Sequence, residues 1–186
     1  CRVAECSWCC SLLLDQMMDG AADPWGVALD PEGKRLAITL SGVHQIAIID
    51  LAKLPDLLAK DPAALANDLS ALHSRGMIQR LNLPAQGPRG IAVSPDGKGI
   101  AVAGYFSGNI VLLDANGGNP EAIALGKQDK PDLVRRGEMA FHNANLCYQR
   151  WLSCATCHPG ARADGLNWDL LNDGMGNPKN TRSMVF

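Results

Sequence analysis

Apolar and polar positions recur along the first two thirds of the chain at a fixed offset. A shift of 64 residues aligns PWGVALDPEGK at 24–34 with PRGIAVSPDGK at 88–98, and the match continues without a gap to IID at 48–50 over LLD at 112–114. Self-similarity at a fixed period indicates a structural repeat. The chain therefore contains two copies of one folding unit.

Each copy has the pattern of short strands separated by turns. A first apolar run is followed by a Pro-acidic-Gly-Lys turn, a second run at 36–40 or 100–103, a Gly-containing turn and a third run ending in Asp. Proline presets the first turn position, and glycine supplies the positive φ that closes a hairpin. Segments 77–83 and 121–125 are predicted as fourth strands. A four-stranded unit repeated in tandem is what a β-propeller blade requires.

Between the two copies, the strand pattern gives way to a leucine stripe. The leucines fall at helical spacings of three, four and seven, and two prolines stand where they can open or break short helices. These residues are Leu51, Leu54, Leu58, Leu65, Leu69 and Leu72, with Pro55 and Pro62. We expect a helical insertion at about 51–75 that packs its leucines on the propeller, with a partner-docking role as the alternative.

The repeated P-x-G-[VI]-A-[VL]-S-P-D-G-K pattern resembles the YVTN-type propeller repeats over roughly residues 23–126. This resemblance implies blades but no particular ligand. Because a blade is covered by its neighbours, about three repeats or more are needed for stability and typically 4 to 8 for a closed ring. The chain is therefore expected to be a piece of a longer protein. Missing blades or a second chain would cover an exposed blade face, which we expect on the first blade.

Charge and hydropathy exclude two classes of partner. The 186 residues include 17 basic and 19 acidic side chains, intermixed, for a net charge of -2, so no basic footprint for nucleic acid is present. The longest apolar runs, such as 46–49 and 110–113, are far shorter than the roughly 20 residues that cross a bilayer. We expect no transmembrane span.

Residues 1–22 form a cysteine-rich segment that we expect to end in an edge strand. Cys1, Cys6, Cys9 and Cys10 lie within ten residues. The Cys6-x-x-Cys9 spacing is that of a metal or redox pair, but no His or second pair accompanies it. Disulfide use, an artefact of the sequence start and lipid modification of Cys1 are the open alternatives. We expect that any targeting segment has been removed or was never part of the sequence.

After Gly126 the composition changes. The polar stretch KQDKPDL follows, and we place a domain boundary near Lys130, so that the propeller blades occupy 23–130. Residues 134–141 are predicted as a helix. The chain then reaches SCATCHP at 153–159, which holds two of its seven cysteines and one of its four histidines.

Cys154-x-x-Cys157-His158 is the attachment signature for c-type haem. Two thiols one turn apart can add to the two vinyl groups on one porphyrin edge, and the adjoining His then binds the iron as the proximal ligand. Three alternatives remain: a Cys3His zinc site that adds Cys147, a thioredoxin-like redox pair, which lacks its βαβ unit, and a structural disulfide.

The stretch 134–183 resembles the haem-binding start of the di-haem cytochrome c peroxidase and MauG-type group, in the subset that follows YVTN-type blades. In that group an R-G-x-x-L-F-x-x-x-x-L helix precedes S-C-x-x-C-H. The matching residues here are Arg136, Gly137, Phe141, Leu146, Ser153, Cys154, Cys157 and His158. The resemblance implies an incomplete, mainly α cytochrome c-like domain at 131–186. Only one motif is present, and the 28 residues that follow His158 are too few for a second haem lobe. The resemblance therefore implies electron transfer by this chain, and peroxidase chemistry only in the full-length protein.

The iron ligand opposite His158 has three candidates within the chain, Met175, Met184 and His142. A ligand beyond residue 186 and an open position are the alternatives. Trp151 and Trp168 are candidates to stack beside the porphyrin, although both can equally be core residues.

The sequence therefore predicts a β plus α fold, with about two four-stranded propeller blades followed by a mainly α haem domain. The predicted function is that of a haem c electron-transfer protein, part of a peroxidase-like oxidoreductase with one covalent haem. Its partner would be a redox protein or a small electron donor or acceptor. Covalent attachment points to the periplasm or cell surface, where the five remaining cysteines, an odd number, leave at least one unpaired within the chain. The alternative is a propeller binding module with a structural Cys3His zinc site.

Overall fold

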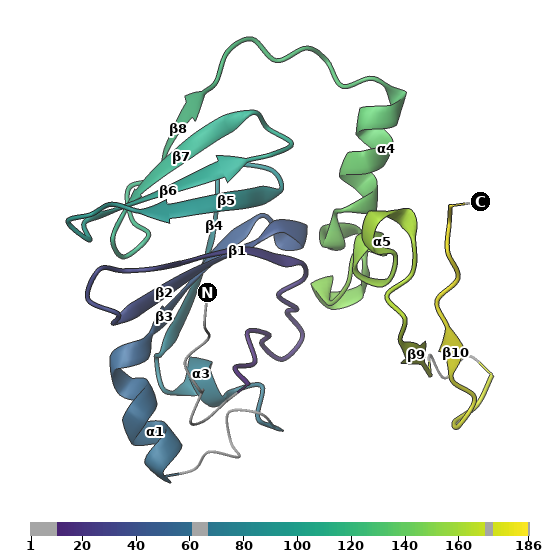
Figure 1. Cartoon of the computed structure of the whole chain (residues 1–186), viewed down its shortest axis with the longest axis horizontal. Helices are drawn as coiled ribbons and strands as arrows, with labels where there is room; N and C mark the ends of the chain where they lie inside the picture. Colours follow the sequence, from purple (N-terminus) through teal and green to yellow (C-terminus); the bar gives the residue numbers. More distant parts are fainter. Residues whose placement is uncertain (1–10, 61–66, 170–172, 186) are drawn as a thin grey trace, which may run out of the picture.

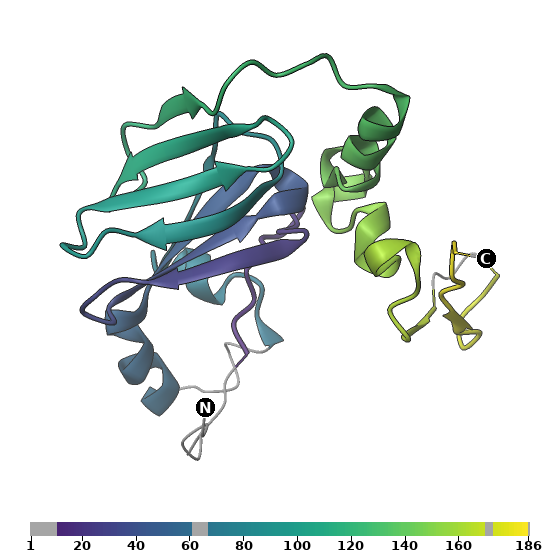
Figure 2. The same ribbon diagram turned by 45° about the horizontal axis from the view of Figure 1, so that its top comes forward.

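The computed structural model describes residues 11–60, 67–169 and 173–185. The four N-terminal cysteines and part of the predicted insertion therefore lie outside the described residues. Two four-stranded antiparallel sheets lie face to face, and the C-terminal segment runs along one end of them (Figure 1; Figure 2 shows the same arrangement turned by 45°).

The two sheets are the two sequence repeats. The first consists of β1 (Pro24–Leu29), β2 (Arg35–Leu40), β3 (Gln45–Asp50) and β4 (Ile78–Asn82). The second consists of β5 (Pro88–Val93), β6 (Gly99–Gly104), β7 (Asn109–Asp114) and β8 (Glu121–Ala124). Both sheets follow the strand order of the chain. The predicted four-stranded units are confirmed, and the sheets are propeller-like blades, called blade 1 and blade 2 below.

Alternation along the strands divides the apolar residues between two cores. Ile46 and Ile48 of β3 face blade 2 and pack there against Val102 and Val111, whereas Ile49, on the opposite side of the strand, belongs to a second core beneath blade 1. Successive side chains of a strand point to opposite faces, so one strand supplies both cores. The core that contains Ile46 and Ile48 lies between the two blades and joins them into one body.

The inner strands of the two blades approach closely at Gly26. A Cβ placed on Gly26 would lie 2.1 Å from the Arg89 carbonyl oxygen, so only glycine fits there. The Thr39 hydroxyl, fully buried, donates to the same carbonyl oxygen at 2.9 Å and accepts from the Gly26 N–H at 2.8 Å. A buried hydroxyl thus replaces the strand pairing that is absent between blades.

A second joint between the blades is built on Asp30. Its carboxylate accepts from the backbone N–H groups of Lys34 at 2.7 Å and Arg35 at 3.0 Å and from Arg35 Nε at 3.2 Å. Arg35 continues to blade 2, donating to the carbonyls of Gly97 and Ala115 and to Asn116 Oδ1. The hydrogen bond from the Arg35 backbone N–H is the largest cause that lowers the pKa of Asp30.

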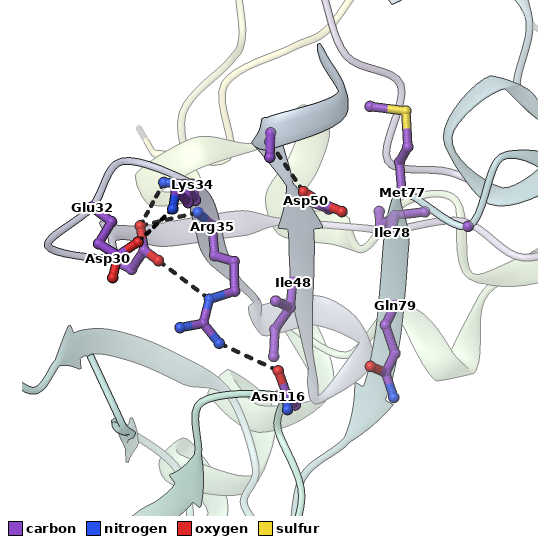
Figure 3. A pocket seen from close by; sticks show the side chains of 12 residues that line it. Asp30, Glu32, Lys34, Arg35, Ile48, Asp50, Met77, Ile78, Gln79 and Asn116 are labelled. Carbon is purple, nitrogen blue, oxygen red and sulfur yellow. Dashed lines mark hydrogen bonds and ion pairs between the residues drawn. The ribbon is translucent and has the colours of Figure 1, made fainter. Parts of the chain in front are cut away.

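Asp30, Lys34, Arg35 and Asn116 are among the residues that line a cleft of about 430 Å³ on blade 1, which Figure 3 shows from close by. Its acidic groups already have partners: Asp30 holds Arg35, and Asp50 accepts from the Ala52 N–H at 3.0 Å. Asp30, Arg35 and Asn116 line this cleft because they form the joint between the blades.

The face of blade 1 turned away from blade 2 is partly covered. Helices η2 (Leu51–Lys53), α1 (Leu54–Lys60) and α3 (Ala71–Ser74) follow β3. Leu57, Leu72 and Ala22 pack on this face. The insertion and the segment before β1 bury much of this face, but Trp25, Val27 and Leu29 of β1 are 55%, 63% and 52% exposed, so blade 1 keeps an exposed apolar strip along β1, in part as expected. Blade 2 also exposes apolar side chains, among them Leu112, Ile123 and Leu125 at 40%, 43% and 66% exposure. The described residues 11–22 contain one β-bridge, Gln16 to Asp19, and no longer strand.

The C-terminal segment consists of short elements. Helix α4 (Leu133–Phe141) confirms the helix predicted for residues 134–141. Helix α5 (Cys154–Cys157) carries both cysteines of Cys154-x-x-Cys157-His158, called the attachment motif below. The rest is η3 (Ala144–Leu146), η4 (Tyr148–Arg150), η5 (Pro159–Ala161) and the two-stranded ribbon of β9 (Asn167–Trp168) and β10 (Lys179–Asn180).

The prediction of a mainly α cytochrome c-like domain is wrong. The described residues are mostly antiparallel sheet, and after residue 131 they contain one nine-residue helix and one four-residue helix. No residue of α4 is buried. A helical domain needs apolar helix faces that pack on one another, and in this segment the fully buried apolar residue is Ala144, which joins the core of blade 1. Within the described residues, no helix has the length and hydrophobicity to span a membrane.

Replacing Asp30 with Ala should cost about 1 to 3 kcal/mol at neutral pH, because three N–H groups lose their acceptor. The folded-state pKa of Asp30 lies below its ordinary value of 3.8, so the carboxylate stabilises the fold above that pH and its contribution is lost as the pH falls through the folded-state pKa. Chemical unfolding at pH 7 and pH 3 should therefore show a cost that shrinks in acid. The exposed neighbour Glu32, changed to Gln, is the control and should have little effect; equal costs for both variants would contradict the assignment.

Candidate functional site

The attachment motif occupies one helical turn. The Ser153 N–H donates to Thr156 Oγ1 at 2.9 Å at the start of α5, and the His158 N–H donates to the Cys154 carbonyl at 3.0 Å at its end. Cys154 is exposed and Cys157 is half-buried, and both are free thiols. The motif therefore presents two thiols from one turn, followed at once by an imidazole.

The His158 ring is oriented by a backbone carbonyl. Its Nδ1 lies 3.1 Å from the carbonyl oxygen of Arg162. A carbonyl only accepts, so in the neutral ring Nδ1 carries the proton and Nε2 keeps its lone pair. This is the arrangement by which ring orientation and tautomer are fixed in histidines that ligate metals.

A cleft of about 420 Å³ opens beside this histidine. It is lined by Cys157, His158, Trp168, Asn177 and residues 179–182. Trp168 is held by its Nε1–H, which donates to Asp164 Oδ2 at 2.7 Å, while the Asp164 N–H donates to the Cys157 carbonyl at 3.2 Å. Burial, and then the Asp164 carboxylate, raise the pKa of the Cys157 thiol.

The other predicted site residues are placed differently. Trp151 does not line this cleft, and its Nε1–H donates to Gln149 Oε1 at 3.0 Å. Met175 is 89% exposed. Met184 lies close to the motif, because its N–H donates to the carbonyl of Ala161, three residues after His158, at 2.9 Å. His142 belongs to an aromatic cluster.

That aromatic cluster joins α4 to the blades. The Arg89 guanidinium lies between the rings of Trp25 and Tyr105, 4.1 Å and 3.6 Å from their centroids, and His142 packs 6.4 Å from Trp25 and 5.9 Å from Phe106. Burial, and then the Arg89 charge, lower the pKa of His142. Stacked guanidinium and ring pairs of this kind stabilise a contact by about 0.5 to 2 kcal/mol each.

Blade 1 holds the motif through the segment before β1. The Gly20 N–H donates to the Gln149 carbonyl at 2.8 Å, and Asp19 pairs with Arg150 at 2.6 Å. The carboxylate of Asp23 accepts from Ser153 Oγ at 2.5 Å and from Thr156 Oγ1 at 2.6 Å. Sequence reasoning missed Asp19 and Asp23, which stand more than 120 positions before their partners.

The described residues contain no group of three or more His, Cys, Asp or Glu side chains that could hold a metal ion between them. Cys147, Cys154, Cys157 and His158 are all described, so they do not form the four-ligand cluster of the zinc alternative. A c-type haem needs from this motif a single imidazole for the iron and two thiols for the vinyl groups of the porphyrin.

Comparison with known proteins gives partial matches, and no protein-family model matches the chain. Over 107 residues, 55% of the chain, it is 33% identical to hydrazine synthase subunit beta of Kuenenia stuttgartiensis, of which it spans 27%. Over 54 residues it is 43% identical to hydrazine synthase subunit gamma of the same organism, of which it spans 15%. The chain therefore spans about a quarter or less of these relatives.

A solved structure of Kuenenia stuttgartiensis hydrazine synthase has a similar fold. It matches with a TM-score of 0.50 and 32% identity, over 55% of this chain and 30% of that one. The resemblance of residues 134–183 to the di-haem cytochrome c peroxidase group stays a prediction from the motifs.

Gly20 gives a test of how the motif is held. A Cβ at this position would lie 2.4 Å from Trp151 Cα and 2.5 Å from the Arg150 carbonyl oxygen, so Gly20→Ala must push residues 149–151 away from blade 1. We expect faster protease cleavage after Arg150 in the native protein. Gly137→Ala is the matched control, because a Cβ there meets nothing within 4 Å and alanine favours the helix. Equal cleavage rates in the two variants would contradict the described contact.

Proposed function

We propose that this chain carries one covalent c-type haem on Cys154, Cys157 and His158 and transfers electrons as part of a larger extracytoplasmic oxidoreductase. The observation that carries the proposal is the combination found on α5: two free thiols on a single turn, followed by an imidazole whose Nδ1 is tied to the Arg162 carbonyl.

The residues fit such a group in three respects. The thiol of Cys154 is exposed and that of Cys157 borders a cleft, so both can be reached by a planar ligand edge. The lone pair of His158 Nε2 is free to bind iron once Nδ1 is protonated. The indole of Trp168 lines the same cleft and is fixed by Asp164, so it offers an apolar surface to a porphyrin.

Bound haem would supply one-electron iron chemistry, and the protein would supply the attachment, the ligand orientation and the surroundings that set the potential. His158 would hold the iron on one side. Of the candidates for the other side, Met184 is tied closest to the motif in the described structure, through its N–H to the Ala161 carbonyl. A sixth ligand would favour electron transfer, whereas peroxide reduction would require an open iron site and a second haem outside this chain.

The relatives support a role within an assembly. Both curated proteins that the chain resembles are named as subunits, beta and gamma, of a hydrazine synthase. We propose that the protein containing this chain also works beside partner subunits in a redox enzyme. Because covalent haem attachment takes place outside the cytoplasm, we propose that the protein works in the periplasm or on the cell surface.

Expression in a host that matures c-type cytochromes tests the attachment. Denatured wild-type protein should retain the mass of one haem, and the double variant Cys154→Ala/Cys157→Ala should retain none. Cys147→Ala is the control, because Cys147 is also an exposed thiol but lies outside the motif, and it should keep the full haem mass. Wild-type protein that emerges from this host with no haem mass, or with bound zinc instead, would refute the proposal.

The role of His158 needs a separate variant. His158→Gly should keep both thioether bonds but lose the proximal nitrogen, so its absorption spectrum should change while its mass shows the haem still attached. Added imidazole should restore the wild-type spectrum by filling the space left by the side chain. A spectrum unaffected by the substitution would show that another residue binds the iron.

A further inference from the structure

The contact between Asp23 and α5 links the propeller to the attachment motif. Its two carboxylate oxygens accept separately, Oδ2 from the Ser153 hydroxyl at 2.5 Å and Oδ1 from the Thr156 hydroxyl at 2.6 Å. Ser153 precedes the first motif cysteine, and Thr156 precedes the second. The Asp23 side chain therefore binds the residue directly before each of the two motif cysteines.

Asp23 holds this position in an unfavourable backbone conformation. Its φ is +55°, in the left-handed region that any residue with a Cβ enters at a steric cost. The equivalent position of blade 2, 64 residues on, is Gly87, with φ +57°. The fold thus requires positive φ at this point of each blade. Blade 2 meets the requirement with glycine, and blade 1 uses aspartate.

The surrounding backbone is the same in both blades. In blade 1 the Ser41 and Gly42 N–H groups donate to the carbonyls of Asp23 and Ala22, at 2.9 Å and 3.2 Å. In blade 2 the N–H groups of Tyr105 and Phe106, at the equivalent positions, donate to the carbonyls of Gly87 and Gln86, at 3.1 Å and 3.0 Å. The difference between the blades therefore lies in the side chains and not in the turn.

In each blade two positions face each other, one of them glycine and the other a larger side chain. The glycine is Gly87, facing Phe106, in blade 2 and Gly42, facing Asp23, in blade 1. A Cβ on Gly87 would lie 2.3 Å from the Phe106 ring, and a Cβ on Gly42, the counterpart of Phe106, would lie 2.8 Å from the Asp23 carboxylate. In blade 2 the aromatic ring fills the space and faces a glycine. In blade 1 the glycine leaves the space free, and the carboxylate that occupies it reaches the motif.

We propose that Asp23 is a positioning residue that fixes the Cys154 to His158 turn on blade 1, ready for haem attachment. As far as it concerns haem, this inference rests on the function proposed above. The carboxylate acts through the two hydroxyls and contacts neither thiol in the described structure. Aspartate stands at this strained φ of +55° because its carboxylate makes two hydrogen bonds that glycine cannot make.

Hydrogen exchange in the whole chain tests the inference with or without haem. In Asp23→Gly, the amides of Thr156 and His158, which are hydrogen-bonded within the turn, should exchange on the order of tenfold faster or more, because two charge-assisted hydrogen bonds are lost. The melting temperature of the blades should stay the same or rise, because glycine relieves the strained φ. Asp23→Asn, whose amide keeps a single accepting oxygen, should be intermediate.

Asn119→Gly is the matched control. Asn119 also has positive φ, +49°, and its side chain contacts Asp114 on blade 2 and not the motif. It should leave exchange at 153–158 unchanged. In a cytochrome-maturing host, the fraction of chains carrying haem should fall in Asp23→Gly and not in Asn119→Gly.

The two proposals fail in different ways. Wild-type protein without haem would overturn the proposed function, and the exchange rates would still decide whether Asp23 holds the turn. Equal exchange at 153–158 in Asp23→Gly and Asn119→Gly would overturn the positioning role, even if haem is attached in both.

Discussion

The contact between residues 19–23 and residues 149–156 holds the Cys154 to His158 turn, the candidate site of this chain, against blade 1. It combines a backbone hydrogen bond from Gly20, an ion pair from Asp19 and the double acceptor Asp23. The buried Arg80 of β4 secures the inner side, donating to the carbonyls of Asp19 and Gly20 at 2.8 Å and 2.7 Å. Because a guanidinium without acceptors would be costly to bury, this segment and blade 1 stabilise each other. Without the contact, the motif turn would be one helical turn on a segment that buries little of itself.

Further contacts with the blades explain how so short a C-terminal segment keeps a defined position. Helix α4 lies on the blades through the stacked Arg89 and the Tyr105 hydroxyl, which donates to Glu138 at 3.1 Å, and η3 inserts Ala144 into the core of blade 1. The segment therefore uses the propeller in place of a hydrophobic core of its own. In this arrangement the haem proposed for α5 would be carried by the blades.

Local patterns were sufficient to predict the blades, and long-range contacts were not predictable. The Pro-acidic-Gly-Lys turns, the short apolar runs and the offset of 64 all lie within a few residues or repeat themselves, so strands, turns and α4 could be predicted. The attachment motif is equally local. Asp23 binds partners 130 and 133 positions away, and nothing near it in the sequence reveals them. Its mismatch with Gly87 in the repeat alignment is a signal that could have identified it. The mainly α domain was predicted from resemblance, but in the described segment no residue of α4 is buried and α5 has only four residues, so the packed helix faces that such a domain needs are not formed.

The account depends on a porphyrin bonded to α5. The most direct measurement is mass and visible spectroscopy of the tryptic peptide Trp151 to Arg162 from protein matured in a competent host and denatured before digestion. The account predicts a coloured peptide that keeps one haem and offers no thiol to an alkylating reagent. A colourless peptide with both cysteines alkylated would contradict it.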